Sequence, residues 1–206
     1  MTRWGRQTLV ADRPTCQAGR GLAGPFTLDL RDGTELDVRS AVGDDLPGVV
    51  DLHERCSARS RNRRYHGGSA RLAPARMRRL LEPARGVTLL ATPTASHSPS
   101  APVVAMANLL GEGDTAEVAL LVRDDWQRRG LGSVLLRRLV WEAEQSGYVA
   151  LDLHVQAENT PMLRVVYRLA RPSMVDRDGS LLTLTVPLTA ADSPARAPLD
   201  LSVPTR

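Results

Sequence analysis

The hydrophobic positions of this chain change between a period of two residues, typical of half-buried strands, and the three-to-four spacing of amphipathic helices. Alternating or continuous apolar runs predict strands over residues 26–30, 36–39, 86–92, 102–110, 116–122, 148–155 and 181–186. Helical spacing predicts helices that begin near Asp44, at Pro74, after Gly132 and at Asn159. The chain is therefore expected to mix strands and helices, with Asp32-Gly33 as the turn of an N-terminal hairpin.

Length and composition set the expected domain organisation. A chain of 206 residues with 42% hydrophobic residues can bury one good core, so we expect one domain over residues 25–188. Residues 1–24 are rich in Arg, Gly, Thr and Pro without periodicity and predict a flexible arm, whereas residues 189–206 predict a disordered tail. The Pro-, Ser- and Thr-rich stretch 93–101 predicts a mobile loop, and residues 176–179 predict a turn.

Charge and cysteine content indicate the expected cellular location and exclude some classes of partner. All 27 basic residues are arginine, and the formal net charge is +4. No apolar run approaches the length of a membrane span, and no signal-type apolar core follows the first residues, so we expect no membrane partner. Cys16 and Cys56 give no disulfide or metal framework, and no His, Cys and carboxylate spacing indicates a metal. A reducing cytoplasm is therefore the expected location.

A basic run raises nucleic-acid binding as an alternative function. It comprises Arg55, Arg59, Arg61, Arg63 and Arg64. Only Tyr65 accompanies the run, and aromatic residues make up 3% of the chain, so surfaces on which bases could stack are scarce. We therefore expect no nucleic-acid partner, and note that an acidic ligand such as a nucleotide cofactor would also suit this charge.

The clearest chemical signal is the loop between the apolar strand 116–122 and the next helix. It reads Q-x-x-G-x-G from Gln127 to Gly132. At a helix N-terminus the first backbone N–H groups lack helical partners and the helix dipole adds positive charge, while glycines let a phosphate approach closely. The chain has no lysine for a P-loop, and Leu135 stands where a dinucleotide fingerprint needs its third glycine. The loop therefore predicts a pyrophosphate site for another kind of phosphorylated cofactor.

The order of strand, Q-x-x-G-x-G loop, helix, strand and an Asn that opens another helix resembles the GNAT superfamily of acyl-CoA-dependent N-acyltransferases. The resemblance covers roughly residues 35–186. It is most specific in Ala116–Val122, Asp125–Gly132 and Ala157–Arg164, which are similar to the GNAT domains of bacterial protein-lysine acetyltransferases. It implies a single-domain α/β fold with a mixed, mostly antiparallel sheet, flanked by about four helices and splayed open between strands 116–122 and 149–155.

The resemblance also implies where acetyl-CoA, the acyl donor, would lie. The main chain of Leu120, Leu121 and Val122 would pair with the pantetheine arm in the cleft of the splayed sheet, and Asn159 would contact the pantetheine or its thioester end. The loop around the pyrophosphate comprises Gln127, Arg128, Arg129, Gly130, Leu131, Gly132 and Ser133. Whether any arginine side chain touches phosphate stays open, because backbone amides alone can hold the anion.

Glu117 is the catalytic candidate. It interrupts an otherwise apolar strand, and a buried carboxylate is costly unless it is paired or used. Acetyl transfer needs a neutral amine, whereas a lysine amine with a pKa near ~10.4 is almost wholly protonated at neutral pH. A partly desolvated carboxylate with a raised pKa can take that proton, directly or through water. The resemblance implies that a glutamate in this A-E-V-A position is the general base for direct attack; a solvent-facing Glu at the sheet end is the alternative.

The binding site of the acceptor amine is indicated only by the resemblance to the GNAT domains of protein-lysine acetyltransferases. Arg61–Gly68 is similar to the loop between the first two helices of the same group, which flanks the acceptor. Arg64, Tyr65 and His66 are therefore candidate substrate contacts. The acceptor amine would belong to a protein lysine or to a small molecule.

The chain also departs from the family pattern. Many GNAT enzymes place a Tyr seven residues after the Asn, but that position here is Val166; Tyr167 follows it and is turned by about 100° on a helix. The usual Gly-Phe after this helix is replaced by Ala170-Arg171. These departures leave a second hypothesis, a non-catalytic acyl-CoA-binding sensor or regulatory module.

Overall fold

The computed structural model describes residues 24–30, 32–67, 72–94, 101–169 and 171–188. The N-terminal arm, the C-terminal tail and most of the 93–101 loop lie outside the described residues, so their expected mobility stays a prediction. Within the described ranges, no helix is both long enough and apolar enough to cross a membrane.

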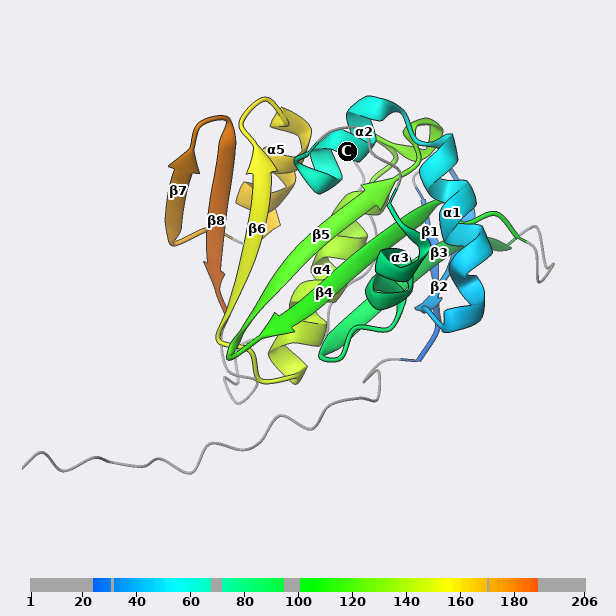
Figure 1. Ribbon diagram of the computed structural model, residues 1–206, viewed down its shortest axis with the longest axis horizontal. Coiled ribbons are helices and arrows are strands. Elements are labelled where there is room, and N and C mark those ends of the chain that lie inside the picture. Colours follow the sequence, from blue (N-terminus) through cyan, green and yellow to red (C-terminus); the bar gives the residue numbers. More distant parts are fainter. Residues whose placement is uncertain (1–23, 31, 68–71, 95–100, 170, 189–206) are drawn as a thin grey trace, which may run out of the picture.

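Among the described residues, eight strands form one sheet (Figure 1). They are β1 (Phe26–Asp29), β2 (Glu35–Ser40), β3 (Gly86–Pro93), β4 (Ala105–Glu112), β5 (Thr115–Val122), β6 (Ala150–Gln156), β7 (Met174–Asp178) and β8 (Leu181–Pro187). Their order across the sheet is β1-β2-β3-β4-β5-β6-β8-β7. Every neighbouring pair is antiparallel except β5 and β6, which are parallel. The predicted mixed, mostly antiparallel sheet is confirmed.

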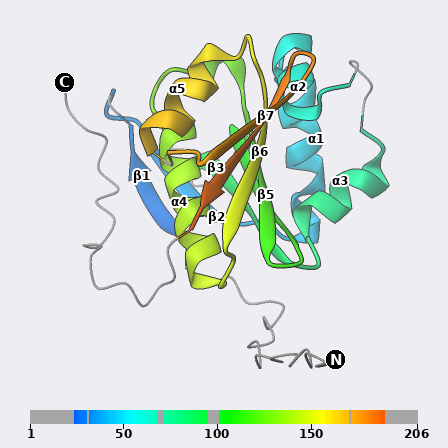
Figure 2. The same cartoon turned by 90° about the vertical axis from the view of Figure 1, so that its left-hand side faces the viewer.

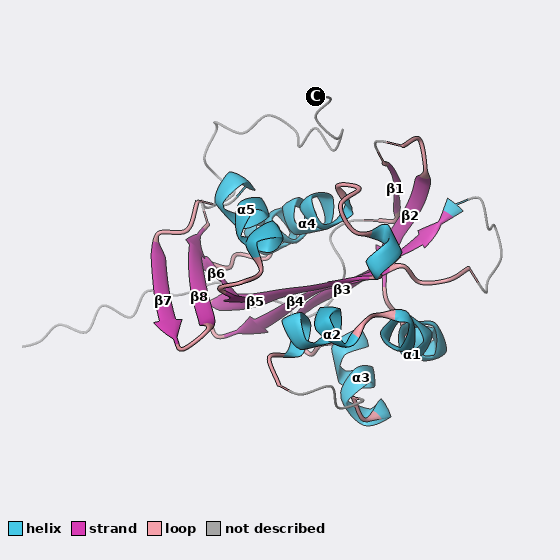
Figure 3. Cartoon of the chain, turned by 90° about the horizontal axis from the view of Figure 1, so that it is seen from above, coloured by secondary structure: helices cyan, strands magenta, loops and turns pink. Residues whose placement is uncertain are grey.

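Helices cover both faces of this sheet (Figure 3). The described residues form α1 (Leu46–Arg55), α2 (Ala58–Tyr65), α3 (Pro74–Leu81), α4 (Leu131–Gln145) and α5 (Thr160–Leu169). Helices α1, α2 and α3 lie on one face, and α4 and α5 lie on the other. Pro47 and Pro74 stand in the first turns of α1 and α3, where their missing N–H groups cost nothing.

Two elements were missed by the sequence prediction, which expected about four helices and a turn over residues 176–179. Helix α2 has almost no apolar residues and so no hydrophobic periodicity, but Ser57 caps it by accepting a hydrogen bond from the Ser60 N–H at 3.2 Å. Strand β7 is exposed along its whole length at the edge of the sheet, so it shows no alternation. The turn lies at residues 179–180 instead.

The alternation of side chains along β5 divides them between two cores. Ala116 and Val118 point into the larger core, which includes the apolar face of α4. Leu121 points into the smaller core with Leu52 of α1. Because side chains two residues apart share a face, Glu117 points to the side of the sheet covered by α1, α2 and α3.

The sheet opens between β5 and β6. These strands pair only over Thr115–Glu117 and Ala150–Asp152, and beyond these residues they diverge (Figure 1). The flanking pairs β4–β5 and β6–β8 stay in register along their length. Figure 2 shows the resulting outer wing of β6, β8 and β7, with α4 and α5 on one side of the sheet and α1, α2 and α3 on the other. The expected splay between these strands is therefore present.

Candidate active site

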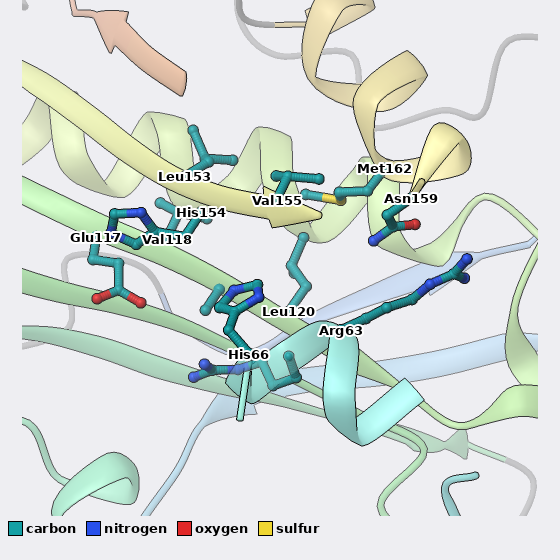
Figure 4. A pocket seen from close by; sticks show the side chains of 12 residues that line it. Arg63, His66, Glu117, Val118, Leu120, Leu153, His154, Val155, Asn159 and Met162 are labelled. Atoms are coloured by element: carbon teal, nitrogen blue, oxygen red, sulfur yellow. The ribbon is translucent and has the colours of Figure 1, made fainter. Parts of the chain in front are cut away.

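The diverging halves of β5 and β6 enclose a pocket with an internal volume of about 70 Å³. Its lining is Arg63, Arg64, His66, Glu117, Val118, Ala119, Leu120, Leu153, His154, Val155, Asn159 and Met162. Glu117 and His154 lie at one end of this pocket, and Asn159 and Met162 lie at the other (Figure 4). Candidates that are far apart in the sequence, from Arg64 to Asn159, are thus brought together.

Glu117 stands where the two strands separate. It is the last residue of β5 that pairs with β6, opposite Asp152, and its side chain is half-buried. Its carboxylate receives no hydrogen bond and forms no salt bridge with any described residue, yet it lines the pocket. A half-buried carboxylate of this kind remains able to accept a proton from a ligand.

Arg64, Tyr65 and His66 do not lie in a loop, contrary to the expectation. Arg64 and Tyr65 form the last turn of α2, and His66 caps its C-terminus in the left-handed region with φ 52°. Arg64 and His66 line the pocket beside Glu117. Burial lowers the pKa of His66, and the nearby His154 and Arg64 lower it further. The neutral imidazole is therefore favoured at this end of α2.

Tyr65 points to a different place. It lines a second hollow of about 520 Å³ between α1, α2 and the start of α3. There its hydroxyl bonds to Nε2 of His53, whose Nδ1 bonds to the Val49 carbonyl at 2.7 Å. Burial raises the pKa of Tyr65 and lowers that of His53. His53 is thus a buried residue with both ring nitrogens bonded, and Tyr65 is separated from the pocket of Glu117.

The loop before α4 presents a row of backbone N–H groups. Gly130 is the N-cap with φ 96°, and Arg128 has φ 63°, so the backbone alternates in hand as in an anion-binding nest. The N–H groups of residues 128–132 bond to no described residue, whereas the Ser133 N–H already bonds to the Gly130 carbonyl at 3.0 Å. A Cβ added at Gly132 would meet nothing within 4 Å. Open space and unpaired donors coincide here, as a bound phosphate requires.

The side chains of Gln127 and Arg129 in the same loop bond to other parts of the protein. Gln127 donates from Nε2 to the Val122 carbonyl and to the Ser60 hydroxyl, both at 3.0 Å. Arg129 bonds to Asp32 at 3.1 Å and stacks on Trp126. Arg128 is exposed. Gln127 therefore fixes the loop to β5 and α2, and the backbone is the part of the loop left for a ligand.

A polar cluster behind Gln127 anchors α2. Asp124 accepts hydrogen bonds from the Ser57 N–H and from the hydroxyls of Ser57 and Ser60, each at 2.8 Å. Burial raises the pKa of Asp124, but these hydrogen bonds outweigh it and the net pKa is lowered. Arg123, next in the chain, is held by a two-point salt bridge to Asp125. The loop before α4 and helix α2 are therefore one connected unit, which the sequence did not reveal.

The backbone of β5 is available on the side facing the gap. The Arg123 N–H bonds to the Val104 carbonyl at 3.0 Å, which fixes the alternation of the antiparallel β4–β5 pair. Leu120 and Val122 must then direct their N–H and C=O groups away from β4, and Gln127 indeed reaches the Val122 carbonyl from that side. Leu121 directs its backbone toward β4 and its side chain into the smaller core.

Asn159 precedes α5 and is half-buried on the pocket. Its carbonyl accepts from the Leu163 N–H at 3.1 Å, so it begins the hydrogen bonding of this helix. Val166 is fully buried, whereas Tyr167 is 52% exposed. The substitution of Val for the family's usual Tyr thus removes the hydroxyl from the inner side of α5.

The sequence analysis missed two buried polar residues behind Arg64. Asn108 of β4 is completely buried; it accepts from Arg64 Nη2 at 2.8 Å and donates to the Thr88 hydroxyl at 2.8 Å. Thr88 in turn donates to the Leu80 carbonyl. A polar Asn in the apolar run of β4 was the available signal, because buried polar groups are retained only when bonded or used.

The basic run of the sequence does not form one exposed surface. Arg55 is paired with Asp51, Arg61 donates to the carbonyls of His53 and Cys56, and Arg64 is buried. Only Arg59 of the run is exposed without a bond to a described residue. Among the described residues, this run thus does not form a continuous arginine stripe of the kind that follows a nucleic-acid backbone.

Comparison with known proteins agrees with this geometry. The model of the acetyltransferase (GNAT) family matches residues 73–170. The acetyltransferase Pat of Mycolicibacterium smegmatis is 38% identical over 71 residues, which are 33% of this chain and 21% of that protein. The chain thus matches about a fifth of the length of this curated relative.

Solved structures extend the likeness to about four fifths of the chain. The GNAT domain of S. lividans PAT superposes with a TM-score of 0.69 at 25% identity, covering 80% of this chain and 97% of that one. A putative acetyltransferase from Salmonella typhimurium, solved with its cofactor acetyl-CoA, has a TM-score of 0.57 at 16% identity, covering 79% and 99%. At that identity the likeness concerns the fold.

The α/β fold with its splayed, mixed sheet is thus the fold of solved GNAT structures. With the family match and the likeness to the Pat proteins, the chain contains a GNAT domain.

Proposed function

We propose that this chain transfers the acetyl group of acetyl-CoA to a primary amine, on a protein lysine or a small molecule, with Glu117 as the general base. The observation that carries the proposal is the position of Glu117: a half-buried carboxylate without a described partner, at the point where β5 and β6 part and a pocket begins. Direct attack needs no nucleophile from the protein, and this pocket holds no Cys, Ser or Thr.

The donor site is supported by three features. The N–H groups of residues 128–132 would hold the pyrophosphate, and the open space at Gly132 leaves room for it. The gap-facing backbone of Leu120 and Val122 would pair with the pantetheine arm as an added strand does. Asn159 would contact the pantetheine or thioester end from the far side of the pocket.

Acetyl-CoA supplies an activated carbonyl on a thioester whose thiol, with a pKa near ~8.5, leaves readily. The neutral amine forms the new bond from nitrogen to the carbonyl carbon, the bond from carbon to sulfur breaks, and Glu117 takes the proton that the nitrogen loses. A gap-facing main-chain N–H of β5 would stabilise the negative charge that develops on the carbonyl oxygen. The absence of a Tyr at position 166 is tolerated because a thiolate can leave without being protonated first.

The test combines acetyl-CoA binding, measured by calorimetry, with release of the free thiol in the presence of amine acceptors. We expect binding and amine-dependent thiol release by the wild type. Gly132→Glu should lose both, because its carboxylate enters the space reserved for the pyrophosphate. The apoprotein should stay folded, since a Glu in the first turn of a helix interacts favourably with the dipole. Gln145→Glu, which adds the same charge at the exposed far end of α4, is the control.

The outcomes separate the hypotheses. Binding with no thiol release across a broad set of amines would favour the sensor and contradict the enzyme. Absence of binding to the folded wild type would contradict both. Unchanged binding by Gly132→Glu would show that the phosphate lies elsewhere.

A further inference from the structure

The outer wing of β6, β8 and β7 has one covered face and one open face. Leu153 of β6 and Leu184 of β8 turn into the larger core, on the side where α4 and α5 lie (Figure 3). Because side chains alternate along a strand, the residues between them turn to the other side, which no described helix covers along β8 and β7 (Figure 1). The cross-strand register gives the residues of this open face, which are Asp152, His154, Gln156, Leu181, Thr183, Thr185, Met174, Asp176 and Asp178.

A row of paired residues joins the open face to Glu117. Glu117 of β5 lies opposite Asp152, which lies opposite Thr185 of β8. Thr185 in turn lies opposite Met174, at the outer edge of the sheet. Neighbouring strands are about 4.8 Å apart, so Asp176, two residues further along β7, is roughly 16 Å from Glu117 in the plane of the sheet. An extended chain spans this distance with about five residues, at ~3.3 Å each.

The open face is acidic. Asp176 and Asp178 are exposed, and Asp152 is half-buried. Asp178 bonds to no described residue, and Asp176 accepts one hydrogen bond, from the backbone N–H of Arg177 at 2.8 Å. Arg177 is the one Arg or Lys in the three strands; it turns to the other face and donates from Nε to the Gly179 carbonyl at 2.9 Å. No arginine of these strands therefore shares the open face with the carboxylates.

Helix α2, at the other side of the pocket, carries charge of the opposite sign. Arg59 is exposed, and Arg63 lines the pocket without a bond to a described residue. Gln156 of the open face donates from Nε2 to the Asn62 carbonyl at 3.4 Å, so the end of α2 borders this face. The pocket of Glu117 thus lies between a basic helix and an acidic sheet face. A ligand that crosses the pocket meets the two charges on different sides.

We propose that the open face is the docking surface for a protein acceptor, an extended segment whose lysine reaches Glu117 and whose basic side chains, about five residues away, meet Asp176 and Asp178. This inference rests on the proposed function and favours a protein lysine over a small molecule as the acceptor. Charge complementarity carries it, because carboxylates on the face that begins at the base attract a basic segment and select its orientation. Met174, which is 59% exposed, and Leu181 would contact the apolar parts of the segment.

The test compares synthetic peptides as acceptors, each with a single lysine, by thiol release from acetyl-CoA. Two peptides carry a pair of arginines four and five residues before or after the lysine, and two carry glutamates at the same positions. We expect one arginine peptide to exceed its glutamate counterpart in kcat/KM by roughly ten-fold, mostly through KM, since two attractive charge pairs replace two repulsive ones. The preference should disappear at about 1 M salt, where charges are screened beyond ~3 Å.

Two double variants locate the surface. Asp176→Asn with Asp178→Asn should raise the KM of the preferred arginine peptide roughly three-fold or more. Asp176→Arg with Asp178→Arg should reverse the preference in favour of the glutamate peptide. Glu35→Gln removes an exposed charge from β2, near the other edge of the sheet, and should leave the KM unchanged. N-acetyl-lysine amide is too short to reach the two aspartates, so its turnover should be the same in all these proteins.

The outcomes distinguish the docking surface from the proposed function. Equal kcat/KM for arginine and glutamate peptides, or an arginine preference that survives in the double arginine variant, would overturn the docking surface. So would a wild-type preference for glutamate peptides, which would place the segment on α2. In each of these cases, acetylation of N-acetyl-lysine amide would leave the proposed function standing. Absence of thiol release with every peptide and with N-acetyl-lysine amide would contradict the proposed function, and this inference with it.

Discussion

Arg64 and Arg138 are equally buried, each 8% exposed, but they are used differently. Arg138 of α4 bonds to Glu142, one helical turn later, at 3.0 Å, and its guanidinium lies over the rings of Phe26 and Trp141. Arg64 bonds to a neutral amide and shares a pocket with Glu117. The carboxylate of Glu142 is thus bonded to Arg138, whereas the carboxylate of Glu117 is left without a described partner and can react.

The two glutamates complete the comparison. Glu142 is 3% exposed, and burial raises its pKa although Arg138 acts in the opposite direction. Glu117 is half-buried at the edge of a cavity, within reach of a ligand. Burial alone therefore does not mark a functional carboxylate; what marks Glu117 is a cavity together with an unbonded side chain.

The largest effect on stability is expected at the buried ion pair of Arg138 and Glu142. Glu142→Ala leaves the buried Arg138 without its carboxylate and should lower the free energy of unfolding by roughly 3–5 kcal/mol. Urea denaturation measures this loss. The kcat/KM of the folded fraction should stay at the wild-type value, and a large drop in it with unchanged stability would reverse the roles given to the two glutamates.

The same pair makes a prediction about pH. The folded pKa of Glu142 is raised above its ordinary value of 4.5. Its contribution to stability is therefore fully present below that value and is lost as the pH rises through the folded pKa. As the pH rises through this window, the wild type should therefore lose stability relative to Glu142→Gln, measured as the free energy of unfolding. A shift in the opposite direction would mean that Arg138 outweighs burial.

The smallest effect is expected at Tyr167. Its side chain is half-exposed on the outer side of α5, while Val166 fills the inner position. Tyr167→Phe should change kcat by less than about two-fold, because an exposed phenol outside the pocket protonates nothing. A loss on the order of ten-fold or more would instead indicate that Tyr167 is the general acid that protonates the leaving thiolate.

The sequence predicted part of the fold and part of the candidate site. Strong periodicity predicted most of the strands and the helix after the Gln127–Gly132 loop, whereas the mixed sheet and its splay were implied by the resemblance to the GNAT superfamily. Helix α2 was missed because its residues are nearly all polar, and only the cap at Ser57 signalled it. Because this helix was missed, the sequence did not show that Arg64 and His66 form a wall of the pocket. It also did not show that Tyr65 points into a different hollow.

Long-range polar contacts were beyond prediction for a different reason. The bond from Arg64 to Asn108 joins residues 44 positions apart, and the bond from Ser60 to Asp124 joins residues 64 apart. Nothing in local spacing specifies such partners, since they depend on which strands become neighbours. The buried Asn108 was visible as an exception in an apolar run, but its partner was not.

The most direct test of Glu117 as the general base is kcat/KM for Glu117→Gln and Glu142→Gln, measured side by side with their affinities for acetyl-CoA. Each variant removes one carboxylate charge and keeps the shape of the side chain. We expect Glu117→Gln to lose roughly 10²-fold or more in kcat/KM, the usual scale for a general base, and to bind acetyl-CoA as the wild type does. Glu142→Gln should keep its turnover. Near-wild-type turnover by Glu117→Gln would contradict the assignment of the base.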